Sequence, residues 1–337
     1  MIAPTAQRKE TGDHIHLQAM ILAAGFGSRL QPLTRYVPKP AFPVCNVPLI
    51  HFTLAELQKN GLRKVIINLH HLPQLVSQTV ASFPGKMETI FSYEHEILGT
   101  GGAVKNVQSH LSSETLLLMN GDILFSGPWR DILPEHRANK ALATLILRHD
   151  PLAAHFGRVV INAEKQIITI PPSQKAPSSA ADSGMFTGVH LIEPELLHYF
   201  PAKSNFCIVR DVYHPLVEQG APIYGTFVDR YWSDIGTPPR YLQANFDIMS
   251  LGGRLLSLPG EPEKDPLKQT LIAESAFIEP GCDIRNFVII GPHCHLEQGS
   301  TVENAVLFPY VHLSKNQTLR NAIAHPEVIV PVAESTR

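Results

Sequence analysis

The chain has 337 residues, 44% of them hydrophobic and 17% charged, enough for one large folded domain and a smaller one. Its formal net charge of −2 lacks the basic excess of a nucleic-acid binder, and no apolar run is long enough to span a membrane, so we expect neither partner. Four cysteines without a Cys-x-x-Cys pair indicate reduced thiols and favour a cytoplasmic location.

Residues 1–17 carry several charges and lack the apolar core of a signal peptide, so we expect a disordered amino-terminal extension. From residue 18 onward, short apolar runs alternate with amphipathic stretches. The runs predict strands at 19–23, 64–69, 89–92, 116–119, 143–147 and 158–161. A helix between the first two would bury Ile50, Leu54 and Leu57, and a second helix would follow Pro73. This alternation predicts an α/β fold with a Rossmann-like, mostly parallel sheet, in which ligands bind beyond the carboxyl ends of the strands.

The first expected strand runs directly into the loop Gly25-Phe26-Gly27-Ser28-Arg29. The two glycines let backbone N–H groups approach a bulky anion closely. Arg29 offers a planar guanidinium suited to phosphate oxygens, and Lys39 adds a second cation. Neither a Rossmann fingerprint nor a Walker loop fits, because Leu30-Gln31-Pro32 stands where those motifs need a glycine or Gly-Lys-Ser/Thr. The loop therefore predicts a phosphate site of another type.

The longer pattern Leu-x-x-Gly-x-Gly-x-Arg-Leu-x-Pro-Leu-Thr, beginning at Leu22 and followed by Pro-Lys-Pro, resembles the sugar-1-phosphate nucleotidyltransferases. The resemblance implies a fold of the nucleotide-diphospho-sugar transferase type. It also implies a reaction in which a nucleoside triphosphate and a sugar 1-phosphate give a nucleotide sugar and pyrophosphate. The family members that the chain most resembles are mannose-1-phosphate guanylyltransferases. N-acetylmuramate-1-phosphate uridylyltransferases and glucose-1-phosphate thymidylyl- or uridylyltransferases are the alternatives, and base and sugar stay open.

Two aspartates lie where a metal site is expected. Asp122 follows the apolar strand 116–119, and Asp234 comes just before a turn and an expected helix that opens at Thr237-Pro238. A carboxylate at a strand end beside a phosphate loop suits Mg²⁺, although an Asx-turn cap would explain Asp122 equally well. The resemblance implies that both aspartates share Mg²⁺, that Arg29 holds the triphosphate, and that Lys39 neutralises a phosphate.

Between these acids, the segment Leu98-Gly99-Thr100-Gly101-Gly102 is dense in glycine. Small residues in a row let a flat base lie against the backbone, and a tight turn before a helix is the alternative explanation. The resemblance assigns this segment to the nucleotide base. The complete set expected to bind nucleotide is Leu22, Ala23, Ala24, Gly25, Gly27, Ser28, Glu94, Gly99, Thr100, Gly101 and Asn120.

The resemblance places Gly157, Thr187 and Gly188 on the sugar side of the site. Between the Gly157 segment and the Thr187-Gly188 segment, many relatives carry Glu-Lys-Pro, whose lysine binds the sugar phosphate. In this chain Ile170-Pro171-Pro172 takes the place of that motif. Lys175, in the Pro- and Ser-rich connection at 171–183, is therefore the candidate ligand of the sugar phosphate. A solvated surface lysine is the alternative, and Arg158 and Arg210 would then be the next candidates.

The tail differs from the rest of the chain. After a Gly- and Pro-rich linker at 251–270, an apolar residue recurs every six positions: Ile272, Ile278, Ile284, Ile290, Leu296, Val302 and Phe308. A six-residue period suits a three-faced β-solenoid, so residues 271–331 resemble a left-handed hexapeptide β-helix of two to three coils. We expect it to brace the domain or to form a homo-oligomer; an acyltransferase role is an unfavoured alternative.

The domain organisation is thus a catalytic domain at 18–250 followed by the linker and the β-helix. The alternative from another functional class is a non-catalytic regulatory homologue that binds a nucleotide sugar. Because Arg29, Lys39, Asp122 and Asp234 are all retained, the sequence favours an enzyme of nucleotide-sugar synthesis.

Overall fold

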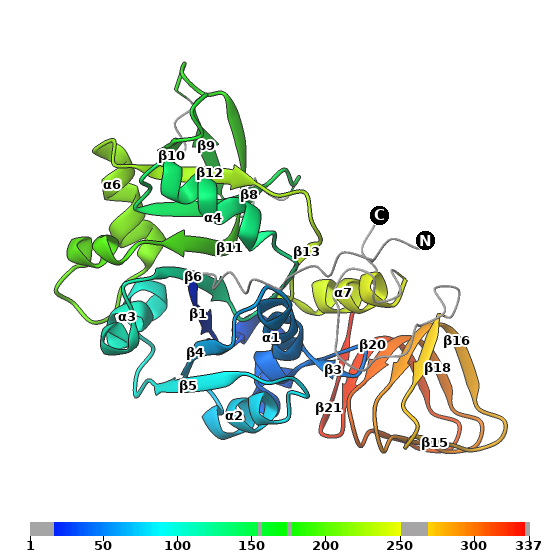
Figure 1. The fold of residues 1–337 in the computed structure, drawn as a ribbon. Coiled ribbons are helices and arrows are strands. Elements are labelled where there is room, and N and C mark those ends of the chain that lie inside the picture. Colours follow the sequence, from blue (N-terminus) through cyan, green and yellow to red (C-terminus); the bar gives the residue numbers. More distant parts are fainter. Residues whose placement is uncertain (1–16, 152, 154–156, 174–176, 251–268, 334–337) are drawn as a thin grey trace, which may run out of the picture.

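Figure 1 shows the computed structural model, which describes residues 17–151, 153, 157–173, 177–250 and 269–333. A larger α/β domain is followed by a smaller domain of stacked strands. The expected amino-terminal extension and linker lie outside the described residues, apart from their last residues, because strands begin at Leu17 and Thr270. Within the described parts of the chain, no helix combines the length and the apolar character needed to cross a membrane.

The centre of the larger domain is a mixed sheet of nine strands. Strands β1, β4, β5 and β6 run parallel to one another, whereas β11 runs antiparallel to β6, β8 and β9, and β12 runs parallel to β8. The strands are β1 (Leu17–Leu22), β4 (Lys64–Leu69), β5 (Glu88–Tyr93), β6 (Thr115–Asn120), β8 (Ala143–Arg148), β9 (Arg158–Ile161), β10 (Ile167–Thr169), β11 (Asp182–Ile192) and β12 (Ile223–Phe227). Two small ribbons pair β2 (Pro43–Val44) with β3 (Val47–Pro48), and β7 (Ile123–Phe125) with β13 (Trp232–Asp234).

The strands predicted from the apolar runs are confirmed, with shifts of one or two residues at some ends. The long strand β11 was not expected, and its first residues overlap the connection predicted at 171–183. Its amino-terminal half, Asp182-Ser183-Gly184, is polar and contains glycine, so it lacks the apolar run that marks a strand. These residues form a strand because they pair with Val159–Ile161 of β9, and the pairing with β8 begins at Met185.

Helices cover both faces of the sheet, because successive residues of β1 enter opposite cores. Ala19 and Ile21 pack with α1, α2 and α4, whereas Met20 packs with α3 and α6. The helices are α1 (Leu49–Lys59), α2 (Pro73–Ala81), α3 (Gly99–Asn106), α4 (Trp129–Ala138), α6 (His214–Glu218) and α7 (Pro238–Ser250). Short helical turns are η1 (Ser28–Leu30), η2 (Leu33–Arg35), η3 (Lys39–Ala41), η4 (Gln108–His110), η5 (Pro194–Tyr199) and η6 (Val209–Tyr213).

The smaller domain is a stack of parallel coils, which confirms the hexapeptide β-helix (Figure 1). Its strands are β14 (Thr270–Ile272), β15 (Phe277–Ile278), β16 (Asp283–Ile290), β17 (His295–Leu296), β18 (Thr301–Leu307), β19 (His312–Leu313), β20 (Thr318–His325) and the antiparallel β21 (Val328–Pro331). Leu296 and Val302 of the apolar ladder are fully buried, whereas Ile272 in the first coil is 43% exposed. The coil shortens by one residue before Phe308: Arg285 pairs with Glu303, 18 residues on, whereas Ile290 pairs with Leu307, 17 residues on. The next coil keeps 17 residues, with Leu296 paired to Leu313 and Val302 to Leu319.

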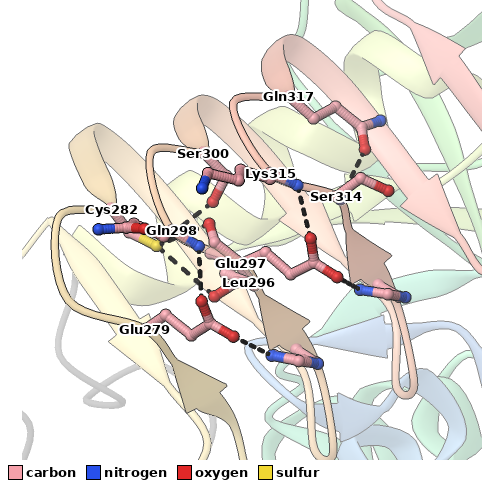
Figure 2. A network of polar contacts seen from close by, with 11 residues as sticks. Glu279, Cys282, Leu296, Glu297, Gln298, Ser300, Ser314, Lys315 and Gln317 are labelled. Atoms are coloured by element: carbon pink, nitrogen blue, oxygen red, sulfur yellow. Dashed lines mark hydrogen bonds and ion pairs between the residues drawn. The ribbon is translucent and has the colours of Figure 1, made fainter.

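Polar contacts join successive coils on the outer face of this domain (Figure 2). The Glu279 carboxylate accepts a hydrogen bond from the backbone N–H of Gln298 at 2.9 Å and lies 3.1 Å from Nε2 of His295. One coil later, Glu297 accepts from the backbone N–H of Lys315 at 2.8 Å. These backbone donors, with the adjacent histidines, hold the pKa of both carboxyls below its usual range. The glutamates therefore act as structural links between coils.

The two domains share one hydrophobic core. Helix α7 lies between the β-helix and the rest of the larger domain (Figure 1), and its Tyr241 packs against Phe42 of the larger domain and Phe308 of the β-helix. The Phe42 and Phe308 rings meet directly, with centroids 5.3 Å apart. The Asn46 amide also donates to the Ile290 carbonyl at 3.1 Å. The β-helix therefore packs directly against the larger domain.

A core shared in this way predicts that damage to the β-helix weakens the whole chain. Phe308→Ala should lower the free energy of unfolding by about 3–5 kcal/mol, because a ring that is 1% exposed leaves a cavity. Phe277→Ala is the matched control, since that ring is 61% exposed and its removal should cost under about 1 kcal/mol. Urea unfolding followed by tryptophan fluorescence measures both, and equal losses in the two variants would contradict the shared core.

Candidate functional site

The signature loop begins where β1 ends and is tied to the neighbouring strand ends. The backbone N–H of Ala23 donates to Asn68 Oδ1 at 2.8 Å, and the Asn68 amide donates to Glu94 Oε1 at 2.7 Å. Glu94 Oε2 in turn accepts from the backbone N–H of Leu98 at 3.0 Å. This buried chain of hydrogen bonds joins the loops that follow β1, β4 and β5. Asn68 was missed from sequence, although a polar residue within the apolar run 65–69 is a usable signal.

Two glycines shape the loop itself. Gly27 has a φ of 61°, and a Cβ there would lie 2.9 Å from the Thr34 side chain, so the close turn requires glycine. A Cβ at Gly25 would meet no atom within 4 Å, which leaves open space beside its backbone. Leu30 and Leu33 of the same motif are fully buried in the core shared with the β-helix. The leucines of the motif thus anchor the loop, and its glycines face a cavity.

An ion-pair cluster lies beside this loop. Lys39 Nζ is 2.7 Å from Asp122 Oδ2 and 3.9 Å from Asp234 Oδ1, and the lysine side chain is only 7% exposed. Arg240 Nη1 lies 2.6 Å from the other oxygen of Asp234. The ribbon of β7 and β13 brings the aspartates together, because Asp234 pairs with Ile123, the residue after Asp122. The predicted proximity of the two acids is therefore observed, whereas Arg240, at the start of α7, was not predicted.

A cavity of about 350 Å³ opens between the loop and the cluster. Most of the residues expected to bind nucleotide line it, and so do Arg29, Lys39 and Asp122. The lining residues from that set are Leu22, Ala23, Ala24, Gly25, Gly27, Ser28, Glu94, Gly99, Thr100 and Asn120. Gly101 does not line this cavity. Its N–H donates to the Phe206 carbonyl at 3.0 Å, and a Cβ there would meet the Phe206 ring at 2.2 Å. Gly101 thus permits α3 to approach the 205–208 segment.

A second cavity, of about 300 Å³, adjoins the first, and Leu22, Arg29, Thr100, Asn120 and Asp122 line both. Gly157, Thr187, Gly188 and Asp234 line the second cavity as well. The rest of its wall is mainly apolar: Ile123, Val159, Ile170, Pro171, Phe186, Ile208, Val209 and Trp232, together with His190 and Cys207. Arg29 and Asp122 therefore lie at the junction of the two cavities. Lys175 lies outside the described residues.

A bulge in β11 shapes the second cavity. The register with β8 shifts between Phe186 and His190, and Gly188 has a φ of 82°. A Cβ on Gly188 would lie 2.4 Å from the Asn120 amide. The Thr187 hydroxyl donates to the Ile146 carbonyl at 2.9 Å and is not directed at a ligand. Burial lowers the pKa of His190 to about 3, so this ring is neutral at the cavity wall.

Neither alternative cation for a sugar phosphate lies on the cavity wall. Arg158 is exposed at the start of β9 and is not among the lining residues. Arg210 pairs with Asp211 at 2.9 Å and its side chain is 64% exposed. This pairing holds the pKa of Asp211 low, at about 2.

The two aspartates could coordinate a divalent cation whose remaining ligands come from a substrate. No group of three or more His, Cys, Asp or Glu side chains converges on one point within the described residues, so a metal cage built from protein ligands alone is not present there. Asp122 and Asp234 do converge, because both face the same ammonium group. Mg²⁺ is commonly held by one or two carboxylates together with substrate phosphates. The donor set therefore suits Mg²⁺ beside the signature loop.

Comparison with known proteins agrees with this geometry. The profile of the nucleotidyl transferase family matches residues 18–250, and that of the GlmU-like C-terminal hexapeptide matches residues 261–335. The chain belongs to the nucleotidyl transferase family. The resemblance to the sugar-1-phosphate nucleotidyltransferases is confirmed, and the protein is an enzyme of the nucleotidyltransferase class.

The relatives of this nucleotidyltransferase are distant. It is 28% identical to a UTP–glucose-1-phosphate uridylyltransferase of Synechocystis, over 87% of this chain and 83% of the relative. It is 27% identical to a mannose-1-phosphate guanylyltransferase of Mycobacterium tuberculosis, over 87% and 80%. The crystal structure of HddC from Yersinia pseudotuberculosis shares the fold, with a TM-score of 0.58 and 20% identity over 68% of this chain and 99% of HddC.

The bulge at Gly188 generates a prediction for the second cavity. Gly188→Ala should strain the backbone and displace the Asn120 amide, lowering kcat/KM for nucleotidyl transfer by about tenfold or more. Gly220→Ala is the matched control, since its φ of 72° imposes similar strain but a Cβ would meet nothing within 4 Å. Gly188→Ala should lose more stability than Gly220→Ala in thermal unfolding, because only Gly188→Ala adds a clash to the backbone strain. Retention of full activity by Gly188→Ala would remove the bulge from the site.

Proposed function

We propose that the two connected cavities hold a nucleoside triphosphate and a sugar 1-phosphate, and that the enzyme joins them into a nucleotide sugar. One observation carries the proposal: the phosphate-loop cavity and the apolar cavity meet at Arg29 and Asp122, beside the Lys39–Asp122–Asp234 cluster. A reaction between two phosphorylated substrates needs two adjoining pockets with cations at their junction.

In the proposed reaction, an oxygen of the sugar phosphate attacks the α-phosphorus, and the bond to the pyrophosphate breaks. Backbone N–H groups around Gly25 and Gly27 hold the triphosphate, and Arg29 holds the leaving pyrophosphate. Lys39 neutralises the phosphate at the reacting centre. No residue acts as general base, because a sugar phosphate is already anionic at neutral pH. Mg²⁺, when held by Asp122 and Asp234, supplies positive charge to the phosphates.

The remaining residues orient the substrates. Gly99 and Thr100 lie against the base, and the backbone at Gly157 and Gly188 lies against the sugar. The mainly apolar wall of the second cavity suits the C–H faces of a sugar ring. Lys175 is the proposed ligand of the sugar phosphate. Arg158, which adjoins Gly157 but does not line the cavity, is the alternative. A homo-oligomer formed through the β-helix stays a prediction.

For the substrates, we propose GTP with mannose 1-phosphate as the first pair to test, since several of the related proteins are named mannose-1-phosphate guanylyltransferases. The alternatives are UTP or dTTP with glucose 1-phosphate, and UTP with N-acetylmuramate 1-phosphate. The related uridylyltransferase of Synechocystis supports the pair of UTP and glucose 1-phosphate. A matrix of four nucleoside triphosphates against these sugar phosphates, with pyrophosphate release as the readout, decides among them. Nucleotide-sugar binding without turnover in any combination would favour a regulatory protein.

The two aspartates give the sharpest test of the reaction. Asp122→Asn and Asp234→Asn should each lower kcat by about 10²-fold or more, because each removes a charge that holds Mg²⁺ against the phosphates. Asp283→Asn is the matched control, since that carboxylate forms an exposed ion pair with Arg285 in the β-helix. Pyrophosphate release with saturating Mg²⁺ measures all three. More than half of the wild-type rate in either site variant would take that aspartate out of the mechanism.

A further inference from the structure

Lys39 has one partner in the proposed reaction and other partners in the structure. In the proposed reaction it neutralises a phosphate, but in the structure its ammonium group lies against Asp122 at 2.7 Å and near Asp234 at 3.9 Å. Its side chain is 7% exposed, and a lysine so buried requires a negative partner. The same aspartates are the proposed ligands of Mg²⁺. Lysine and metal therefore compete for one pair of carboxylates.

The charges of the cluster already balance without a metal ion. Lys39 and Arg240 provide two positive charges against the two carboxylates. A divalent cation between the aspartates would lie close to the Lys39 ammonium group, and at such separations two positive charges repel strongly in a partly buried site. The metal can occupy the position only when Lys39 has moved to another anion.

The first cavity offers such an anion. Lys39 lines it together with Gly25, Gly27 and Arg29, so bound phosphates would lie within the range of its flexible side chain. Arg240 lies outside the residues that line this cavity and contacts Asp234 Oδ2 at 2.6 Å. When Lys39 leaves, Arg240 keeps Asp234 oriented, with Oδ1 toward the vacated position.

We propose that Lys39 is a built-in counter-ion that keeps Asp122 and Asp234 closed to free metal and opens them when it moves to the nucleotide phosphates. Metal and nucleotide then bind cooperatively, and each raises the affinity of the other by the same factor. The inference rests on the proposed function, because it takes the first cavity as the nucleotide site. It makes Lys39 a positioning residue for the metal site as well as a ligand of phosphate.

The test uses Mn²⁺ alone as the probe, measured by electron paramagnetic resonance on the full chain without nucleotide. Lys39→Met keeps an unbranched side chain, one atom shorter than lysine, and removes its charge. The affinity of this variant for Mn²⁺ should therefore exceed that of the wild type by about tenfold or more. Mg²⁺ should also raise the melting temperature of Lys39→Met, because the metal would neutralise the two facing carboxylates that have lost their counter-ion. It should not raise the melting temperature of the wild type. Lys64→Met is the matched control, since Lys64 forms an exposed ion pair with Glu88 and should behave as wild type in both measurements.

Equal Mn²⁺ affinity in Lys39→Met and the wild type would overturn the inference. If Lys39→Met does not fold, Lys39→Gln takes its place in the same nucleotide-free comparison, because its amide also removes the charge, and an Mn²⁺ affinity equal to that of the wild type would refute the inference. Pyrophosphate release by the wild type is measured in parallel. Turnover without the metal effect overturns only this inference, and the metal effect without turnover overturns only the proposed reaction.

Discussion

The contact on which the site depends is the ion pair between Lys39 and Asp122, with Asp234 3.9 Å from the same ammonium group. Two carboxylates repel each other when they face across a partly buried space, and a cation between them removes that repulsion. The three residues come from η3, the end of β6 and the end of β13, segments far apart in the chain. The cluster therefore fixes how the signature loop, the central sheet and the β7–β13 ribbon meet. It also sets the position at which the two cavities join.

Helix α7 connects this cluster to the carboxy-terminal domain. Arg240 on its first turn contacts Asp234, and the next residue, Tyr241, is fully buried among aromatic rings of both domains. Leu30 and Leu33 of the signature loop enter the same core. The β-helix thus packs behind the signature loop and the β7–β13 ribbon, which gives it a structural role without requiring any chemistry of its own.

Local patterns in the sequence predicted the parts that depend on local physics. The apolar runs predicted the parallel strands, and the Gly25–Arg29 string predicted a glycine-shaped loop after the first strand. Strand periodicity and glycine conformation are properties of short segments. The missing parts depend on long-range packing: β11 is a strand through its neighbours, and Arg240 contacts Asp234 through the placement of α7. Gly101 was assigned to the base on resemblance, whereas here it packs against Phe206. The six-residue ladder predicted the β-helix but not the one-residue shortening of the coil between Glu303 and Ala305.

The most direct test of the central claim is a crystal structure with an α,β-methylene nucleoside triphosphate and Mn²⁺, using anomalous scattering to locate the metal. We expect one anomalous peak between Asp122 and Asp234, phosphates against the Gly25–Arg29 loop, the base beside Gly99 and Thr100, and Lys39 Nζ on a phosphate oxygen. A triphosphate bound outside this loop, or a peak away from both aspartates, would contradict the central claim.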